Sequence, residues 1–301
     1  MGIEERHIKT LSRLDDDHVR RLDEALAKLE QSVIRVTSKL PITDGKLHDL
    51  TAAISARQQL REAFQSDLLR SVNGIVVDYD EAAASVVGLF DQASADGLII
   101  SQADNIKHLK KLTFQGFEEI ANTHLETLSR NIYQATIAGK ALDDVVMDIR
   151  HAINGVYIQS DNDAAQVLVD FVRTNTGVAD KAEAVQEAID KLHTIYARDK
   201  VGANLRRYAV AYAHDALMQF SASVNVSTAI ELGAERWKYY GTTMGDTRDF
   251  CIRHEDKVMT TEEIREIWAN ETWAGKSAGD PFIVRGGYNC RHHFRAVFGE
   301  L

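Results

Sequence analysis

The clearest hydrophobic pattern in this chain lies near its beginning, where apolar residues recur at alternating spacings of three and four. They are Val19, Leu22, Leu26, Leu29, Val33, Val36 and Leu40. This spacing predicts an amphipathic helix of about three heptads that ends at Leu40-Pro41. Its apolar face either packs on the same domain or pairs with a partner helix as a coiled coil. In the second case Leu22, Leu26, Leu29, Val33 and Val36 form the partner-binding seam.

The next part of the chain also predicts helices, because prolines occur only at Pro41 and Pro281. After a turn at 41–45, periodic apolar stretches separated by glycines predict a series of helices. Their expected ranges are 46–72, 78–95, 102–138, 141–153, 161–174, 179–199 and 201–223. We expect this region to form a helical body.

The pattern changes near residue 233, where aromatic and β-branched residues predict short strands at 236–243, 257–260, 281–284 and 293–298. Thr260 and Glu263 form the signature of a capping box, which predicts a helix beginning there. The expected fold is therefore mainly α, with a coiled-coil-like N-terminal helix (1–45), a helical body (46–232) and a small C-terminal α+β module (233–301).

Composition narrows the function classes. Hydrophobic residues make up 45% and charged residues 27% of the 301 residues, as in globular proteins. The formal net charge of −10 disfavours general DNA coating or binding to an anionic membrane. No apolar run approaches the roughly 18 to 20 residues needed to cross a bilayer. The first residues show no signal-peptide core, and with only two cysteines we expect a protein of a reducing cytoplasm.

Both cysteines lie in the C-terminal module, and each is followed three residues later by a histidine. Structural zinc takes four nitrogen or sulfur ligands, which proteins commonly supply as two close pairs. Cys251 with His254, and Cys290 with His292 or His293, fit that arrangement. Two alternatives stay open at this point: buried thiols beside hydrogen-bonded histidines, or a disulfide between Cys251 and Cys290.

Charged residues around the cysteines have further interpretations. Asp246 and Arg248 are spaced to form a carboxylate–guanidinium pair that fixes the turn before Cys251. Alternatively, Asp246 caps or closes the turn after Gly245. Arg285, Arg291 and Arg295 either line a solvated strand face or contact DNA phosphates.

These residues together carry a resemblance to a known family. Trp237-Lys238-Tyr239-Tyr240, Asp246-Thr247-Arg248, Cys251-Ile252-Arg253-His254, Lys257-Val258 and Gly286-Gly287-Tyr288-Asn289-Cys290-Arg291-His292 resemble the signature of the phage Mu F-like minor head proteins, also called phage head morphogenesis proteins. The motif covers about a fifth of the chain. The sequence departs from the family pattern at Asp256, where the family has glycine, and at His254, where it has cysteine.

The resemblance implies a non-enzymatic minor capsid protein that acts in head morphogenesis. Its expected partners are the portal protein and the major capsid or scaffolding protein, with packaged DNA as a further contact. Its expected location is the procapsid or virion, assembled in the cytoplasm of a bacterial host. The implied structural motif comprises Trp237, Asp246, Arg248, Lys257, Gly287, Asn289 and Arg291.

Two other function classes compete with this interpretation. The first is a metal-dependent hydrolase or nuclease in which His292 or His293 acts with Asn289 and a metal-bound water. The second is a helical oligomeric adaptor that is built on the N-terminal seam.

Overall fold

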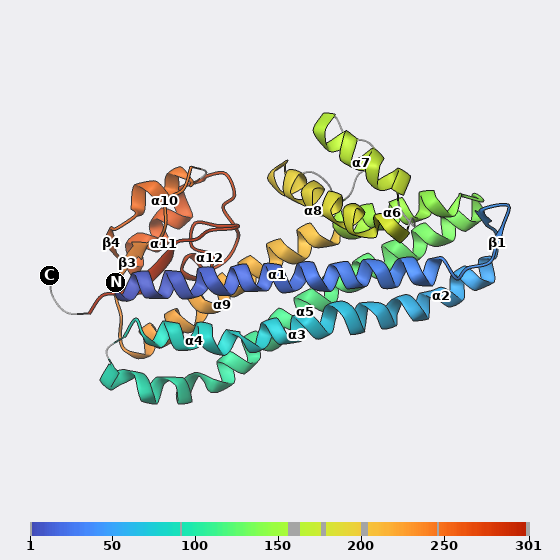
Figure 1. The fold of residues 1–301 in the computed structure, drawn as a ribbon. Helices are drawn as coiled ribbons and strands as arrows, with labels where there is room; N and C mark the ends of the chain where they lie inside the picture. Colours follow the sequence, from blue (N-terminus) through green and yellow to red (C-terminus); the bar gives the residue numbers. More distant parts are fainter. Residues whose placement is uncertain are drawn as a thin grey trace. The chain divides into compact units, whose positions relative to one another are not determined.

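The computed structural model describes residues 2–90, 92–155, 163–175, 179–199, 204–245 and 247–298, and helices dominate it (Figure 1). In chain order the elements are α1 (Ile3–Thr37), β1 (Ile42–Thr43), β2 (Lys46–Leu47), α2 (Leu50–Ala63), the π-helix η1 (Phe64–Leu69), α3 (Arg70–Val77), α4 (Tyr79–Val87), α5 (Gln92–Ile137), α6 (Leu142–Asn154), α7 (Asp163–Asn175), the 3₁₀ helix η2 (Ala179–Lys181), α8 (Ala182–Asp199), α9 (Leu205–Glu231), β3 (Arg236–Tyr240), α10 (Asp249–His254), β4 (Val258–Thr260), α11 (Thr261–Asn270), α12 (Pro281–Val284) and β5 (His293–Ala296). The predicted class, mainly helical with a small C-terminal α+β module, is confirmed.

The chain forms two compact units, each assembled from separate stretches of sequence. One comprises residues 1–19, 74–115 and 211–301, and the other comprises 20–73 and 116–210. The predicted boundaries at 45/46 and 232/233 stay a prediction. None of the helices in the described part of the chain is long and apolar enough to span a membrane.

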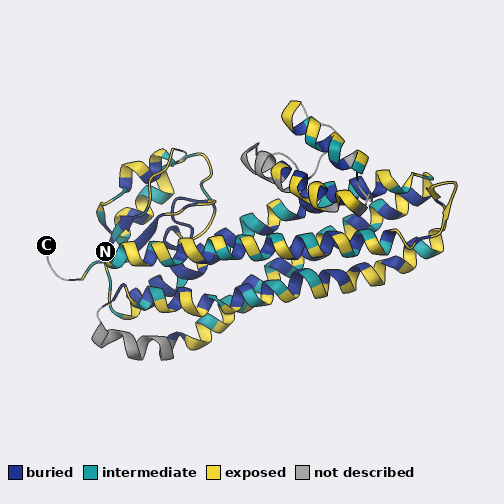
Figure 2. Ribbon diagram, viewed as in Figure 1, coloured by how far each residue is buried: buried dark blue, intermediate teal, exposed yellow. Residues whose placement is uncertain are grey.

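The apolar face of α1 packs inside the chain. Leu22, Leu26, Leu29 and Val33 are each 0% exposed, and Val36 is partly buried. Buried and exposed residues accordingly alternate along this helix (Figure 2). Because the seam already lies in the core, it offers no surface to a partner in this fold. The partner-binding interpretation of these residues is wrong, and intrachain packing is what the spacing indicates.

Several predicted helix ends differ from the structure. Lys46 pairs with Thr43 in a short antiparallel hairpin, so α2 begins only at Leu50, where the Asp49 side chain accepts a hydrogen bond from Ala52 N–H. Neither Gly74 nor Gly97 interrupts a helix, since α3 and α5 run through them. Gly155 does end α6, in the left-handed conformation with φ 78°.

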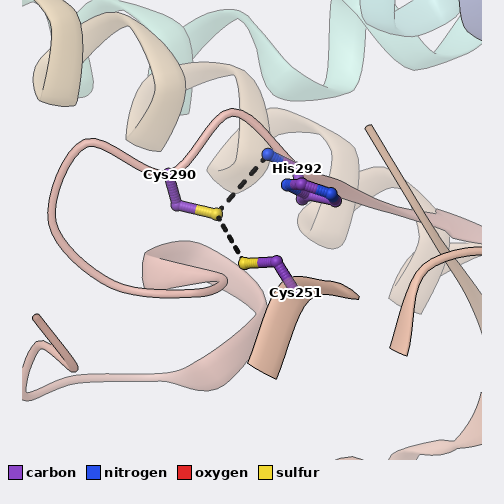
Figure 3. Close-up of side chains that lie close together, drawn as sticks. All are labelled: Cys251, Cys290 and His292. Carbon is purple, nitrogen blue, oxygen red and sulfur yellow. Dashed lines mark hydrogen bonds between the residues drawn. The ribbon is translucent and has the colours of Figure 1, made fainter. Parts of the chain in front are cut away.

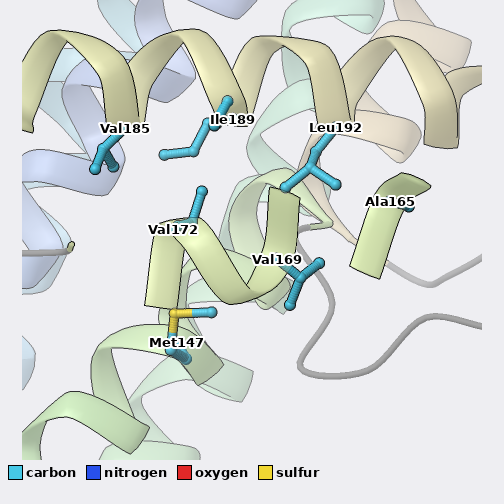
Figure 4. Close-up of a cluster of buried hydrophobic side chains, with 8 residues drawn as sticks. Met147, Ala165, Val169, Val172, Val185, Ile189 and Leu192 are labelled. Carbon is cyan, nitrogen blue, oxygen red and sulfur yellow. The ribbon is translucent and has the colours of Figure 1, made fainter. Parts of the chain in front are cut away.

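Helices α6, α7 and α8 enclose a small apolar core in the unit that contains residues 116–210 (Figure 4). Its buried members are Met147, Ala165, Val169, Val172, Val185, Ala188, Ile189 and Leu192. They recur every three or four residues on α7 and α8, so each helix presents one apolar stripe to the other. The predicted amphipathic helices in this region are therefore confirmed.

The C-terminal module is organised by a three-stranded antiparallel sheet in the order β4-β3-β5. Along the central strand, Trp237 and Tyr239 are buried on the same face because side chains alternate along a strand. Trp237 lies opposite Met259 on β4 and Ala296 on β5. The sheet thus directs the first and third residues of the Trp-Lys-Tyr motif into the module core.

Helix α11 begins with the predicted capping box. The Thr260 hydroxyl accepts from Glu263 N–H at 3.2 Å, and the Glu263 carboxylate accepts from Thr260 N–H at 2.7 Å. The strand predicted at 281–284 is wrong, because these residues form the short helix α12. Asp280 caps its first turn by accepting from Phe282 N–H, and Pro281 stands at the position where a helix tolerates proline.

Candidate metal centre

Two cysteines and one histidine converge in the interior of the C-terminal module. Cys251 comes from α10, and Cys290 and His292 come from the segment that leads into β5 (Figure 3). Each of the three residues is 2% exposed. Their candidate ligand atoms all lie within 4.8 Å of one another, so the group could hold a metal ion. The prediction of a metal site is thereby supported for these three residues.

The two sulfur atoms lie 3.8 Å apart as free thiols, so the disulfide alternative is not what the structure has. Cys290 Sγ also accepts from Gly286 N–H at 3.2 Å and from His292 N–H at 3.4 Å. Backbone donors aimed at a sulfur favour its thiolate form, which is the form that binds metals.

The hydrogen bond between the two thiols shifts their pKa values in opposite directions. The hydrogen bond from Cys251 lowers the pKa of Cys290 well below its usual value, against the opposing effect of burial. The same bond raises the pKa of Cys251, and burial adds to that increase. The two pKa shifts have opposite directions because the two thiols share one hydrogen bond.

A buried arginine places a positive charge beside Cys290. Arg285 is 1% exposed and contributes to the low pKa of Cys290. Its guanidinium donates to the carbonyls of Cys290 at 3.1 Å and Ile283 at 2.7 Å. The predicted solvated or DNA-contacting role is wrong for this residue. Arg295 also differs from that prediction, since it pairs with Glu4 of α1 at 2.9 Å.

Two glycines permit the close packing around the sulfur atoms. A Cβ at Gly286 would lie 2.5 Å from Cys251 Sγ and 2.8 Å from Cys290 Sγ. A Cβ at Gly241 would lie 2.6 Å from the ring of His292. Any larger residue at these positions would displace the candidate ligands.

His292 is oriented by its neighbours. Its ring stacks on Tyr239 with centroids 5.2 Å apart, and its Nε2 lies 3.9 Å from a carboxylate oxygen of Glu255. Glu255 is itself held by the Thr243 hydroxyl. At that distance the carboxylate lies near the ring but accepts no hydrogen bond from it.

The other two predicted histidines lie outside the group. The ring of His254 packs against Phe250 at 4.7 Å. His293 points away toward Tyr240 and His7, at ring distances of 5.8 and 5.3 Å. Successive residues of an extended chain point to opposite sides, so His292 and His293 cannot serve the same centre. Among the described residues, the prediction of a ligand set that includes His254 and His293 is therefore wrong.

Most residues of the predicted structural motif make defined contacts within the module that holds this centre. Trp237 is buried and donates through Nε1 to the Thr261 hydroxyl at 3.0 Å. The Lys257 carbonyl accepts from Tyr239 N–H at 2.9 Å. Asp256 has φ 63°, a left-handed conformation that glycine adopts most readily. Glycine is the residue of the family pattern at that position.

The remaining motif residues hold the loops. Arg248 donates to the carbonyls of Ala274, at 2.9 Å, and Tyr288. Asp246 lies outside the described residues, so the predicted Asp246–Arg248 pair stays a prediction. Gly287 has φ 103°, and a Cβ there would lie 2.0 Å from the Gly275 carbonyl oxygen.

The loop that carries Cys290 is held by a hydrogen bond to a helix that is distant in sequence. Asn289 N–H donates to the Asp215 carboxylate of α9 at 2.8 Å. Arg291 remains exposed and donates to the sulfur of Met244. The chain segment around Cys290 is therefore anchored on both sides of the cysteine.

Sequence reasoning missed Tyr239, Arg285 and Gly286 as parts of this centre. Tyr239 had one usable signal, because it lies two residues after Trp237 and a strand places both on one face. Arg285 and Gly286 gave no comparable signal, since their roles depend on how the loop folds over α10.

Comparison with known proteins gave no match to a protein-family model, to a curated protein or to a solved structure.

Proposed function

We propose that this chain is a phage minor head protein that acts in head morphogenesis. The observation that carries the proposal is the convergence of the motif residues on one small module. Trp237, Arg248, Cys251, Lys257 and Asn289 lie on different strands, helices and loops of this module, and each contributes to the sheet, the loops or the sulfur pair. Residues that resemble a family signature and also act together in one module are better explained by membership of that family than by chance spacing.

The proposed partners are the portal protein and the major capsid or scaffolding protein. The acidic, helical part of the chain suits protein–protein packing better than binding along a DNA backbone, because phosphate repels a net negative surface. Packaged DNA is a secondary proposed contact. The proposed location is the procapsid or virion, reached by assembly in the cytoplasm of the bacterial host.

We further propose that the metal of the C-terminal module is structural zinc. Two thiolates and an imidazole are ligands that zinc prefers, whereas magnesium and calcium prefer oxygen. Burial of all three residues supports a structural role, because a catalytic metal needs an open position that substrate can reach. The hydrolase alternative therefore has less support than the structural one, and burial of the N-terminal seam weakens the adaptor alternative.

The proposed function is tested by quantitative mass spectrometry of purified procapsids and virions from the phage or prophage that encodes this chain. The copy number of this chain is measured against that of the portal protein, with a host cytoplasmic protein as the contamination control. A defined copy number that persists through gradient purification is expected. Loss of the chain from both kinds of particle, at the level of the host control, would contradict the proposal.

A further inference from the structure

A tyrosine hydroxyl completes the group around the two sulfur atoms. Tyr239 Oη lies 3.3 Å from Cys251 Sγ and 3.6 Å from Cys290 Sγ. The residue is 0% exposed, and its position on the central strand β3 fixes the ring. Its ring also stacks on His292, so it contacts all three residues of the candidate metal group.

The distances among these atoms match those that a tetrahedral zinc ion requires. Zinc–sulfur bonds of about 2.3 Å and zinc–oxygen bonds of about 2.0 Å give sulfur–sulfur edges of about 3.8 Å and sulfur–oxygen edges of about 3.5 Å. The observed sulfur–sulfur distance is 3.8 Å, and the two sulfur–oxygen distances are 3.3 and 3.6 Å. One face of a zinc tetrahedron is thus present in the arrangement of the side chains.

The space beside this face is kept free by glycine. A Cβ at Gly286 would lie 2.5 and 2.8 Å from the two sulfur atoms and 3.1 Å from Tyr239 Oη. It would therefore press on the same three atoms at once. A glycine at this point is explained if those three atoms must keep their spacing.

We propose that Tyr239 is the fourth zinc ligand of the C-terminal module, with Cys251, Cys290 and His292. This inference rests on the zinc proposed above and is independent of the role in phage heads. Binding releases the protons of the phenol and the thiols to solvent, so one Zn²⁺ with two thiolates and one phenolate carries a net charge of −1. The buried guanidinium of Arg285, which contacts the Cys290 carbonyl, balances that charge.

Zinc titration of the metal-free, full-length protein tests the assignment through its near-ultraviolet difference spectrum. Coordination converts a phenol into a phenolate, which has its own absorption band. The wild-type protein should develop the tyrosinate band and saturate at one zinc per chain. Tyr239→Phe should lack the band and bind zinc at least about tenfold more weakly. Tyr240→Phe is the matched control, because Tyr240 is an adjacent buried tyrosine whose ring packs toward His293.

The wild-type spectrum alone decides the question if Tyr239→Phe fails to fold. Stoichiometric zinc binding by the wild-type protein without a tyrosinate band would overturn the assignment of Tyr239. A band that persists in Tyr239→Phe would overturn it as well. Failure of the wild-type protein to bind zinc would overturn the zinc site itself, whereas presence in phage particles is decided by a separate measurement.

Discussion

Substitution of Gly286 by alanine should destabilise the C-terminal module selectively. The new Cβ would lie 2.5 Å from Cys251 Sγ, 2.8 Å from Cys290 Sγ and 3.1 Å from Tyr239 Oη. All three distances are shorter than ordinary van der Waals contact, and the three groups are buried. Overpacking of this kind costs about 1 to 3 kcal/mol. We therefore expect the free energy of unfolding of the module to fall by about 2 kcal/mol, and its zinc affinity to fall with it.

The positions of the tryptophans provide the assay for this prediction. All three, Trp237, Trp268 and Trp273, belong to the C-terminal module. Tryptophan fluorescence during urea unfolding therefore reports on this module, while far-ultraviolet circular dichroism reports mainly on the helices elsewhere. A loss of about 2 kcal/mol lowers the urea midpoint by about 1 M if the slope is about 2 kcal/mol per molar.

Gly245→Ala is the matched control in the same module. A Cβ at Gly245 would meet nothing within 4 Å. The substitution should leave the fluorescence midpoint unchanged or raise it slightly, because alanine restricts the unfolded chain. The reasoning is refuted if Gly286→Ala unfolds at the wild-type urea concentration and keeps the wild-type zinc affinity.

Three further predictions concern stability. Burial lowers the pKa of His7 to about 4. Below pH 6.5 the unfolded chain therefore binds a proton at His7, whereas the folded chain keeps this histidine neutral until about pH 4. The contribution of His7 to the free energy of unfolding should thus be full above pH 6.5 and fall by about 3 kcal/mol as the pH drops to 4. His7→Gln should reduce this dependence on pH in urea titrations. Arg150→Ala removes the buried partner of Glu30, at 3.1 Å, and should cost about 3 to 5 kcal/mol by circular dichroism. The exposed Arg57 is its control, for which Arg57→Ala should cost about 0.5 kcal/mol or less. Thr260→Ala removes the cap of α11 and should lower the free energy of unfolding by about 1 kcal/mol, which lowers the urea midpoint followed by fluorescence. An unchanged midpoint would show that the cap adds no stability.

The parts of the fold that follow from local rules could be predicted from the sequence. The spacing from Leu22 to Val33 specifies one apolar face whatever covers it, so the helix was predictable. The capping box at Thr260 needs only residues three apart. Which surface covers the seam was not predictable, because that depends on contacts with distant segments.

Predictions that relied on helix breakers were less successful. Glycine costs a helix only about 1 kcal/mol relative to alanine, and α3 and α5 continue through Gly74 and Gly97. Proline was assigned to a strand at Pro281, where a side-chain cap from Asp280 instead starts a helical turn. A single glycine or proline therefore does not by itself fix where an element ends.

The sequence indicated which types of residue form the candidate site, but not which individual residues belong to it. The spacing of Cys251 and His254 suggested a ligand pair, yet the turn of α10 places the His254 ring against Phe250. Adjacent His292 and His293 could not be distinguished until the direction of the segment before β5 was known. Tyr239 joins the group only because β3 and α10 meet in three dimensions, which no local pattern encodes.

A closed metal centre in the C-terminal module is tested most directly by metal analysis of the full-length chain, purified without added metal and without a metal-binding tag. We predict one zinc ion per chain, with thiols of Cys251 and Cys290 that react with thiol reagents only after a chelator is added. Protein that contains no metal, and whose two thiols react freely in the native state, would contradict the claim.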